Sequence, residues 1–501
     1  MKRTAPLFIL LVLILPVVVL TVRLFSLQVV MGKRYFDLSS RNSTRVIVTL
    51  APRGRILDAH GRILADSRPG YHLTYVKSDA RGGTIDFIAS LLDRDPDELL
   101  ENAQRAPSPY VPVRIARDLN FASVARVEEY SSDLPGVRIE IEPVRRYFLG
   151  EAVFHCLGYV GDVSEEEREK DPTYYQGDKT GKRGLEKVYE RFLRGRNGAK
   201  FVEVDALGYE RGPSPERKGV PPLPGNDIYL TVRAELESLA FSILEPYSCA
   251  CLIAMRPSDG AILALVSKPS IDPNKFAVGL PPGFWQEVQK SEVSPFWNRA
   301  IQASYPPGST FKLLTMAIGL EEGLVRPETR FEKCTGEITI GNKVCKCWEI
   351  HGSLSLLDAL AQSCNVYFYQ MGMLIGAERI LRYAKQCGFG KPTGVDLTGE
   401  GRGFIPTLDW YDERYGKRGW GRGIAANLAI GQGEILVTPL QLLRFVCGIA
   451  NNGRMPTPHL LNCIVSPEGD TVEQWTPSFK SLPFSETVSY THLTLPTKAK
   501  V

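Results

Sequence analysis

The N-terminal segment most constrains what this chain can become. An uncharged apolar run covers residues 5–22, lies between two basic residues and Arg23, and is followed by further apolar residues to about Val30. Such a run is just long enough to span a bilayer as a helix. No small-residue cleavage site of the A-x-A kind follows it, which predicts an uncleaved anchor rather than a removed signal peptide.

The charges on either side of this run bear on its orientation. Basic residues before it favour a cytoplasmic N-terminus, although Arg23, Lys33 and Arg34 on the far side weaken that inference. No second run of spanning length occurs later in the sequence. We therefore expect a single-pass protein of the cytoplasmic membrane, with the bulk of the chain outside the cytoplasm.

Size and charge narrow the class of protein. A chain of 501 residues predicts two or three domains. Its 60 basic and 56 acidic side chains give a net charge of +4, which argues neither for nor against an acidic partner. No long basic tract with interleaved aromatic residues occurs, so we expect no nucleic-acid partner. The ten cysteines are scattered, which excludes a disulfide-framework mini-protein.

A stretch rich in proline and glycine, residues 219–226, is the best domain boundary. Before it, alternating segments predict two strands and two short helices, at 45–50, 71–76, 85–92 and 123–130. After it, we expect a strand, a helix and two apolar strands, at 227–231, 234–244, 249–255 and 261–267. Strands that alternate with helices indicate an α/β or α+β enzyme domain.

Residues 305–312 join a stiff loop to an apolar helix. The loop at 306–308 contains two prolines and a glycine, and the apolar residues after it cover nearly every side of the predicted helix, which should be buried. Ser309 would lie in the first turn, with Lys312 three residues on and on the same face. Because burial disfavours a charged lysine, Lys312 can act as a neutral base toward Ser309. The alternative is an N-capping serine and a lysine whose head reaches solvent.

A second group, Ser363-Cys364-Asn365, lies between two predicted helices at 354–362 and 366–374. A hydroxyl and a carboxamide at such a break can point together into a cleft, where they would relay a proton and hold a substrate amide. The alternative is ordinary helix punctuation by serine and asparagine.

Four residues between these two groups have the spacing of a metal site: Cys334, Cys345, Cys347 and His351. Cys364 is a fifth candidate, and the metal would be a structural zinc ion. Outside the cytoplasm a disulfide from Cys334 to Cys345 or Cys347 is the alternative. The sequence leaves both possibilities open.

The chain resembles the class B penicillin-binding proteins, and most closely their penicillin-binding protein 2 type, which serves rod-shape elongation. Residues 309–312 match the S-x-x-K motif of this superfamily, and residues 363–365 match its second motif with cysteine in the middle. Further segments resemble motifs of the family along most of the chain: 52–58, 61–65, 184–190, 269–276, 429–433 and 438–441.

The resemblance implies a multidomain α+β fold. We expect an anchor at 1–30, an elongated, β-rich pedestal or dimerisation-like domain at 31–225, and a transpeptidase domain at 226–487. The last would be a sheet flanked by helices, as in serine β-lactamases.

The resemblance also implies a peptidoglycan D,D-transpeptidase that needs no cofactor and is a target of β-lactams. Ser309, deprotonated by Lys312, would attack the penultimate D-Ala carbonyl of a stem peptide and release the terminal D-Ala. Ser363 would help to pass a proton to the leaving amine, and Asn365 would hold an amide of the substrate. The backbone N–H of Ser309 would form half of the oxyanion hole.

At the third motif of the family, K-T-G, this sequence departs from the family pattern. The motif should lie on a strand well after the second motif, but the match in this chain is at 179–181, in the pedestal. The residues after about Glu486 continue no pattern of the family, and we expect 488–501 to be a non-native tail on an incomplete transpeptidase domain. Loss of one oxyanion donor would lower the rate by roughly 10²–10³.

The expected partners are peptidoglycan stem peptides, β-lactams, the membrane, a RodA-like SEDS-family glycosyltransferase and proteins of the elongation complex. A division-type, septal transpeptidase is the nearest alternative. A non-catalytic scaffold that activates a SEDS glycosyltransferase is another. In a Gram-negative organism the catalytic domain would be periplasmic.

Overall fold

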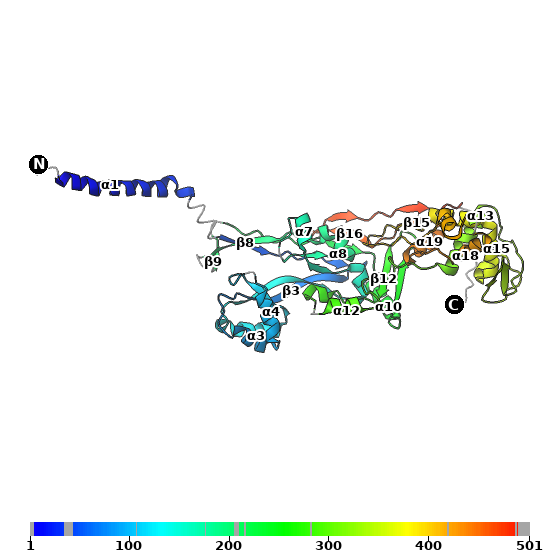
Figure 1. Ribbon diagram of the computed structural model, residues 1–501, viewed down its shortest axis with the longest axis horizontal. Coiled ribbons are helices and arrows are strands. Elements are labelled where there is room, and N and C mark those ends of the chain that lie inside the picture. The colour runs from blue at the N-terminus through cyan, green and yellow to red at the C-terminus, as the bar shows by residue number, and fades with distance from the viewer. Residues whose placement is uncertain are drawn as a thin grey trace. The chain divides into compact units, whose positions relative to one another are not determined.

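The computed structural model describes residues 5–34, 44–106, 108–175, 177–204, 210–214, 217–280, 283–417, 420–485 and 488 (Figure 1). The chain forms two compact units. The first unit contains Met1–Pro52 and Gly195–Pro224, and the second contains Arg53–Arg194 and Gly225–Val501. Apart from Val488, the tail expected at 488–501 lies outside the described residues.

The first unit contains the N-terminal helix and a small sheet. Helix α1 (Ala5–Phe25) continues as a π-helix, η1 (Ser26–Val30), and the segment Leu13–Val30 is long and apolar enough to cross a membrane. This segment is not buried against the rest of the protein, which fits the predicted single-pass anchor. The sheet has the order β1-β8-β9, with bounds Thr44–Thr49, Gly198–Val204 and Glu210–Pro213.

The second unit is built around a seven-stranded sheet. Its order is β17-β16-β10-β2-β3-β4, and β5 also pairs with β3. The bounds are β2 Ile56–Leu57, β3 Ile63–Tyr75, β4 Val113–Leu119, β5 Val137–Tyr147, β10 Asp227–Leu230, β16 Leu461–Val465 and β17 Thr471–Gln474. Because β2 pairs in parallel with β10, this sheet contains strands from both sides of the boundary expected near 225.

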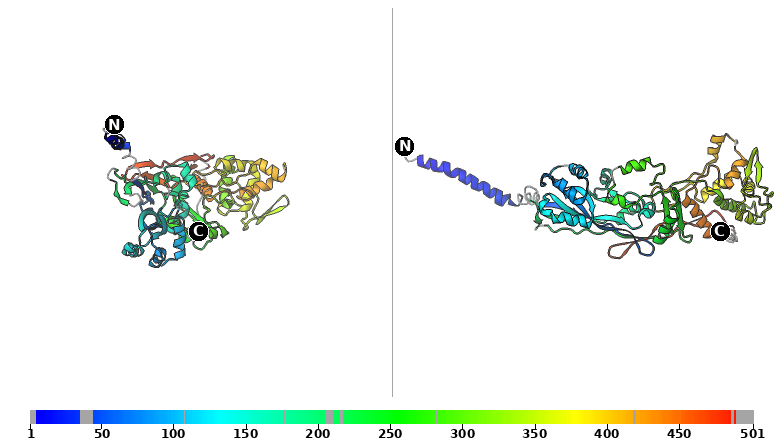
Figure 2. Two further views of the ribbon diagram at one scale, coloured as in Figure 1. Left: turned by 60° about the vertical axis from the view of Figure 1, so that its left-hand side comes forward. Right: turned by 90° about the horizontal axis from the view of Figure 1, so that it is seen from below.

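Helices cover the two ends of this unit. At one end, α3 (Thr84–Leu92), α4 (Pro96–Gln104) and α5 (Phe121–Glu129) enclose a small apolar core. At the other end lies the largest core, formed mainly by α13 Lys312–Glu321, α14 Leu356–Ala361, α15 Asn365–Ile375, α16 Ala377–Gln386, α18 Arg422–Ala429 and α19 Pro439–Ala450. Figure 2 shows these two groups of helices far apart along the unit.

A two-stranded sheet lies beside the larger core, with α10 (Ala234–Ile243) packed on it. Its strands are β11 (Ala250–Met255) and β12 (Ile262–Lys268), within two residues of the predicted bounds. The remaining short elements are η2 Ser131–Asp133, η3 Gly150–Val153, α6 Phe154–Leu157, β6 Val160–Asp162, α7 Glu165–Lys170, β7 Lys179–Gly181, α8 Gly184–Val188, α9 Glu190–Leu193, α11 Asn274–Val278, α12 Phe284–Lys290, η4 Gly308–Phe311, β13 Glu337–Ile340, β14 Lys343–Lys346, α17 Leu408–Tyr415, β15 Arg454–Pro456 and β18 Phe479–Ser481. The mixed α+β content agrees with the predicted fold class.

A buried ion-pair network fixes the start of the sheet. The Glu186 carboxylate is fully buried and accepts hydrogen bonds from Arg145 at 2.7 Å and Arg53 at 2.8 Å. Arg53 also pairs with Glu190 at 2.7 Å. Burial by itself would raise the pKa of Glu186, but the two guanidinium groups outweigh it and lower that pKa. The network therefore ties the strand that begins near Arg53 to α8 and α9.

Candidate active site

A single turn of 3-10 helix, η4, presents Ser309. Gly308 has a φ of +59°, which turns the chain out of the proline loop, and the Thr310 hydroxyl donates to the carbonyl of Pro307 at 2.6 Å. Ser309 is exposed, whereas Lys312, the first residue of α13, is fully buried. The structure therefore has an exposed serine hydroxyl three residues before a buried lysine.

The hydrogen bonds around Lys312 bring the two motifs together. Its Nζ donates to the Ser363 carbonyl at 2.8 Å, the Ser363 hydroxyl at 3.0 Å and Oδ1 of Asn365 at 2.7 Å. The Ser363 hydroxyl in turn donates to Oγ of Ser309 at 3.1 Å. The hydrogen-bonded route from Lys312 to Ser309 therefore passes through Ser363.

The backbone of Ser363 has an unusual left-handed conformation, which determines how this residue faces Lys312. Its φ is +50°, a left-handed conformation that costs a residue with a side chain on the order of 1–3 kcal/mol. Neighbouring hydrogen bonds hold it, from Ser363 N–H to Leu360 O at 3.0 Å and from Cys364 N–H to Ala359 O at 2.9 Å. This conformation turns both the carbonyl and the hydroxyl of Ser363 toward Lys312.

The environment of Lys312 favours the neutral amine. Burial lowers its pKa to about 8, and the nearby thiols of Cys347 and Cys364 oppose this shift only in part. The ring of Phe368 lies 5.6 Å from Nζ and forms part of this apolar surrounding. A lysine with such a pKa can accept a proton near neutral pH.

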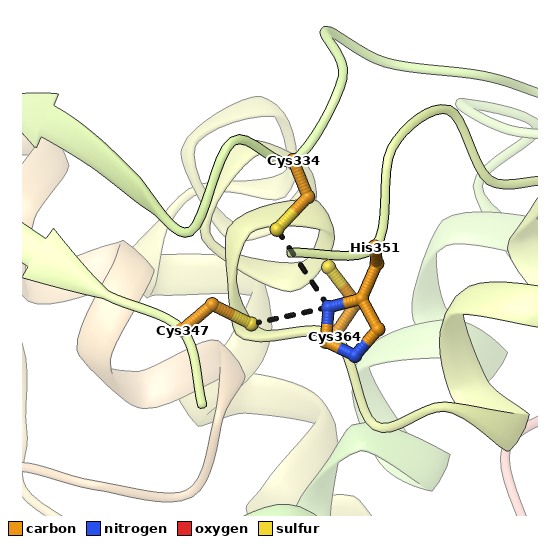
Figure 3. Close-up of side chains that lie close together, drawn as sticks. All are labelled: Cys334, Cys347, His351 and Cys364. Atoms are coloured by element: carbon orange, nitrogen blue, oxygen red, sulfur yellow. Dashed lines mark hydrogen bonds between the residues drawn. The ribbon is translucent and has the colours of Figure 1, made fainter. Parts of the chain in front are cut away.

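Four metal-ligand side chains gather beside the motif that contains Ser363: Cys334, Cys347, His351 and Cys364 (Figure 3). Their donor atoms all lie within 4.8 Å of one another. Nδ1 of His351 is 3.5 Å from Sγ of Cys347 and 3.7 Å from Sγ of Cys334. All ten cysteines carry free thiols in this structure.

Cys345 does not join this group. It lies within β14, opposite Ile338 of β13, and its side chain packs into the apolar core. Cys347 follows the end of that strand, where the chain turns toward His351. The structure thus brings together Cys334, Cys347 and His351 with Cys364, the fifth candidate, and leaves Cys345 outside the group.

Cys347 also contacts the second motif, residues 363–365, directly. Its sulfur accepts the N–H of Asn365 at 3.2 Å. Burial by itself would raise the pKa of this thiol, but backbone N–H groups around it lower that pKa below its ordinary value. In contrast, burial raises the pKa of Cys364 to about 12. The close link between Cys347 and Asn365 is a contact that the sequence did not predict.

The Lys-Thr-Gly sequence at 179–181 lies far from this site in structure as well as in sequence. It forms strand β7, which pairs with β6. Lys179 forms an ion pair with Asp162 at 2.6 Å, and the Gly181 N–H donates to Glu190 at 2.7 Å. These residues therefore belong to the pedestal, and they do not line the Ser309 site.

Comparisons with known families agree with this arrangement. Residues 250–492 match the family model of the penicillin binding protein transpeptidase domain. Residues 48–230 match the family model of the penicillin-binding protein dimerisation domain.

Individual relatives cover most of the chain. The peptidoglycan D,D-transpeptidase MrdA of Haemophilus influenzae is 30% identical over 471 residues, which is 91% of this chain and 71% of the relative. A solved complex of penicillin-binding protein PBP2 with MreC from Helicobacter pylori matches with a TM-score of 0.75 and 27% identity, over 90% of this chain and 82% of that one. A solved peptidoglycan synthase complex, in which polymerization and crosslinking are coordinated, matches with a TM-score of 0.71 and 28% identity, over 98% of this chain and 84% of that one. On these grounds, together with the two motifs around Lys312, the chain belongs to the class B penicillin-binding proteins of the PBP2 (MrdA) type.

Proposed function

We propose that this protein is a membrane-anchored peptidoglycan D,D-transpeptidase that works through an acyl-enzyme on Ser309. The observation that carries the proposal is the chain of hydrogen bonds from Lys312 through Ser363 to Ser309, with separations of 3.0 and 3.1 Å. It connects an exposed nucleophile to a buried base. The name of a relative, a peptidoglycan D,D-transpeptidase, supports peptidoglycan as the substrate, and the family resemblance implies its stem peptides.

In the acylation step, Oγ of Ser309 attacks the carbonyl carbon of the penultimate D-Ala. The hydroxyl proton passes by way of the Ser363 hydroxyl to Nζ of Lys312. The bond from that carbonyl carbon to the nitrogen of the terminal D-Ala then breaks, and the leaving amine takes up the proton along the same route. Oδ1 of Asn365 accepts a hydrogen bond from Nζ of Lys312 at 2.7 Å and so orients the lysine amine. Nδ2 of Asn365 donates to the Lys346 carbonyl at 3.5 Å, and its second N–H would be the donor to the acyl chain.

In the second step, an amine of a neighbouring stem peptide attacks the ester carbonyl. Its proton returns to Oγ of Ser309 as the ester bond breaks, which regenerates the enzyme and leaves a new cross-link. A β-lactam that resembles the D-Ala-D-Ala end would stop at the ester. The backbone N–H of Ser309 would stabilise the oxyanion in both steps, as the family resemblance implies.

We place this reaction in cell elongation, on the outer side of the cytoplasmic membrane. The MrdA relatives support elongation rather than division. A solved complex of PBP2 with MreC supports an MreC-like protein as one partner. A solved synthase complex that coordinates polymerization with crosslinking supports a peptidoglycan-polymerising enzyme as another. The apolar segment Leu13–Val30 supports a single membrane span, with the catalytic unit periplasmic in a Gram-negative cell.

Labelling with a fluorescent penicillin tests the nucleophile. We expect the 501-residue chain to take up one label that survives denaturation, because the adduct is an ester. The Ser309→Ala variant should take up none. Ser242→Ala, which changes an exposed serine on α10, is the matched control and should label like the parent. Label on the Ser309→Ala variant would contradict the proposal.

The pH dependence of labelling tests the base. Because burial lowers the pKa of Lys312 to about 8, the amine is protonated below that pH and cannot accept the Ser309 proton. We therefore expect the acylation rate constant to rise with pH and to reach half its maximum near pH 8. Stopped-flow fluorescence between pH 5.5 and 10 would measure it. A rate constant that does not change over this range would exclude Lys312 as the base.

We further propose that Cys334, Cys347, Cys364 and His351 hold a structural zinc ion. Three cysteines and one histidine are a common zinc ligand set. Ligands of a tetrahedral zinc ion lie about 3.5–3.8 Å apart, given bonds of about 2.0–2.3 Å. The sulfur-to-Nδ1 separations of 3.5 and 3.7 Å fit that geometry. These side chains therefore suit the ion without a large movement.

A zinc ion here would have a structural consequence for the catalytic motif. Cys364 lies between Ser363 and Asn365, and Cys347 accepts the N–H of Asn365. An ion held by both sulfurs would fix the break between α14 and α15. The chemistry at Ser309 would remain with the protein's own side chains.

Metal analysis tests this site. We expect about one zinc ion per purified chain, as in other structural sites with four protein ligands. Cys347→Ser should lower the zinc content and the thermal stability, because binding energy of such a site is folding energy. Cys345→Ser is the matched control, since Cys345 lies on β14 outside the group, and it should keep the ion. A parent without zinc, or equal loss in both variants, would contradict the proposal.

A further inference from the structure

The C-terminal end of α18 touches the catalytic segment at two places. The N–H of Gly308, the residue before Ser309, donates to the carbonyl of Gly431 at 2.9 Å. The hydroxyl of Thr315, one helical turn after Lys312, donates to the carbonyl of Ala429 at 2.8 Å. Thr315 is fully buried, so water cannot replace this hydrogen bond.

The backbone of Gly431 is packed directly against the turn that carries Ser309. A Cβ atom at Gly431 would lie 2.2 Å from the Gly308 oxygen and 2.7 Å from Cβ of Phe311, closer than atoms can approach. Its φ of +70° also favours glycine. The turn at 429–431 therefore fixes how far η4 and α13 can move toward α18.

The same end of α18 also supports the other half of the active site. A Cβ atom at Gly372 of α15 would lie 2.4 Å from Cβ of Ala429 and 2.6 Å from the carbonyl oxygen of Ala425. Helix α15 begins at Asn365. The helix with Lys312 and the helix with Asn365 are thus both packed against one short segment of α18.

We infer that Thr315 and the turn at 429–431 are positioning elements for acylation, an inference that rests on the proposed function. Neither touches the reacting atoms. They hold α13 in register with α15, so that the Ser363 hydroxyl stays 3.1 Å from Oγ of Ser309. Displacement of a reacting group by about 1 Å can cost on the order of 10² in rate, so loss of a tether that sets this distance should slow the chemistry.

Acylation kinetics of Thr315 variants test this inference. In the 501-residue chain, Thr315→Val keeps the shape of the side chain and removes the donor to Ala429. We expect the rate constant for a fluorescent penicillin at saturation to fall about tenfold, with little change in the half-saturating concentration, because geometry and not binding is altered. Thr315→Ser restores the donor and should return the rate constant to within about threefold of the parent.

The control is a buried threonine with the same chemistry elsewhere in the unit. The Thr231 hydroxyl donates to the carbonyl of Ile262 at 2.7 Å, away from Ser309. Thr231→Val should lower thermal stability and leave the acylation rate constant unchanged. The acylation rate constant does not depend on how much of the protein is folded. A loss of stability alone therefore lowers the amplitude of the labelling signal and leaves the acylation rate constant unchanged.

Four results would decide against the inference or its premise. A Thr315→Val rate constant equal to that of the parent would overturn the positioning role, and so would an equal slowing by Thr231→Val. Should Thr315→Val fail to fold, Thr315→Cys, similar in size with a weaker donor, should give an intermediate rate, and a parent-like rate would again overturn the role. A parent chain without label would instead overturn the proposed function.

Discussion

The hydrogen bonds of Lys312 are the interaction on which this site depends. A buried lysine ammonium group is costly unless its donors are satisfied, and here two residues accept hydrogen bonds from all three. Those residues, Ser363 and Asn365, lie at the break between α14 and α15, so one amine joins α13 to α15. Ser309 needs no contact of its own with Lys312, because the Ser363 hydroxyl reaches both. The exposed Ser309 hydroxyl and the buried Lys312 amine are thereby connected by hydrogen bonds.

Two groups of residues stabilise the hydrogen bonds around Lys312 from different sides. On one side, Gly431, just after α18, accepts a hydrogen bond from Gly308, and Ala429, the last residue of α18, accepts one from Thr315. On another side, Cys347 accepts the N–H of Asn365 and belongs to the cysteine and histidine group. The strained backbone of Ser363, with its φ of +50°, is held by the hydrogen bonds from Ser363 N–H to Leu360 O and from Cys364 N–H to Ala359 O. The site is therefore a junction of three packed segments and does not depend on a single loop.

Local patterns predicted the parts of this protein well. The apolar run after Gly308 has the period and length of a buried helix, and the strands near 250 and 262 have clear turn signals between them. Contacts between distant segments could not be predicted in the same way. Ser363 bridges 54 residues to Ser309, and Thr315 bridges 114 residues to Ala429. Spacing alone predicts Cys345 as a ligand, because it does not show that this residue lies on β14 with its side chain in the apolar core.

The measurement that tests this account most directly is the acylation rate constant of Ser363→Ala. Lys312 would receive the proton of Ser309 through the Ser363 hydroxyl. Removal of that hydroxyl therefore breaks the only hydrogen-bonded route from Ser309 to Lys312 seen among the described residues. The account predicts that the rate constant falls by about 10²–10⁴, the usual contribution of a positioned proton-transfer group. A Ser363→Ala variant that acylates as fast as the parent would contradict it, and would mean that Lys312 reaches Ser309 directly.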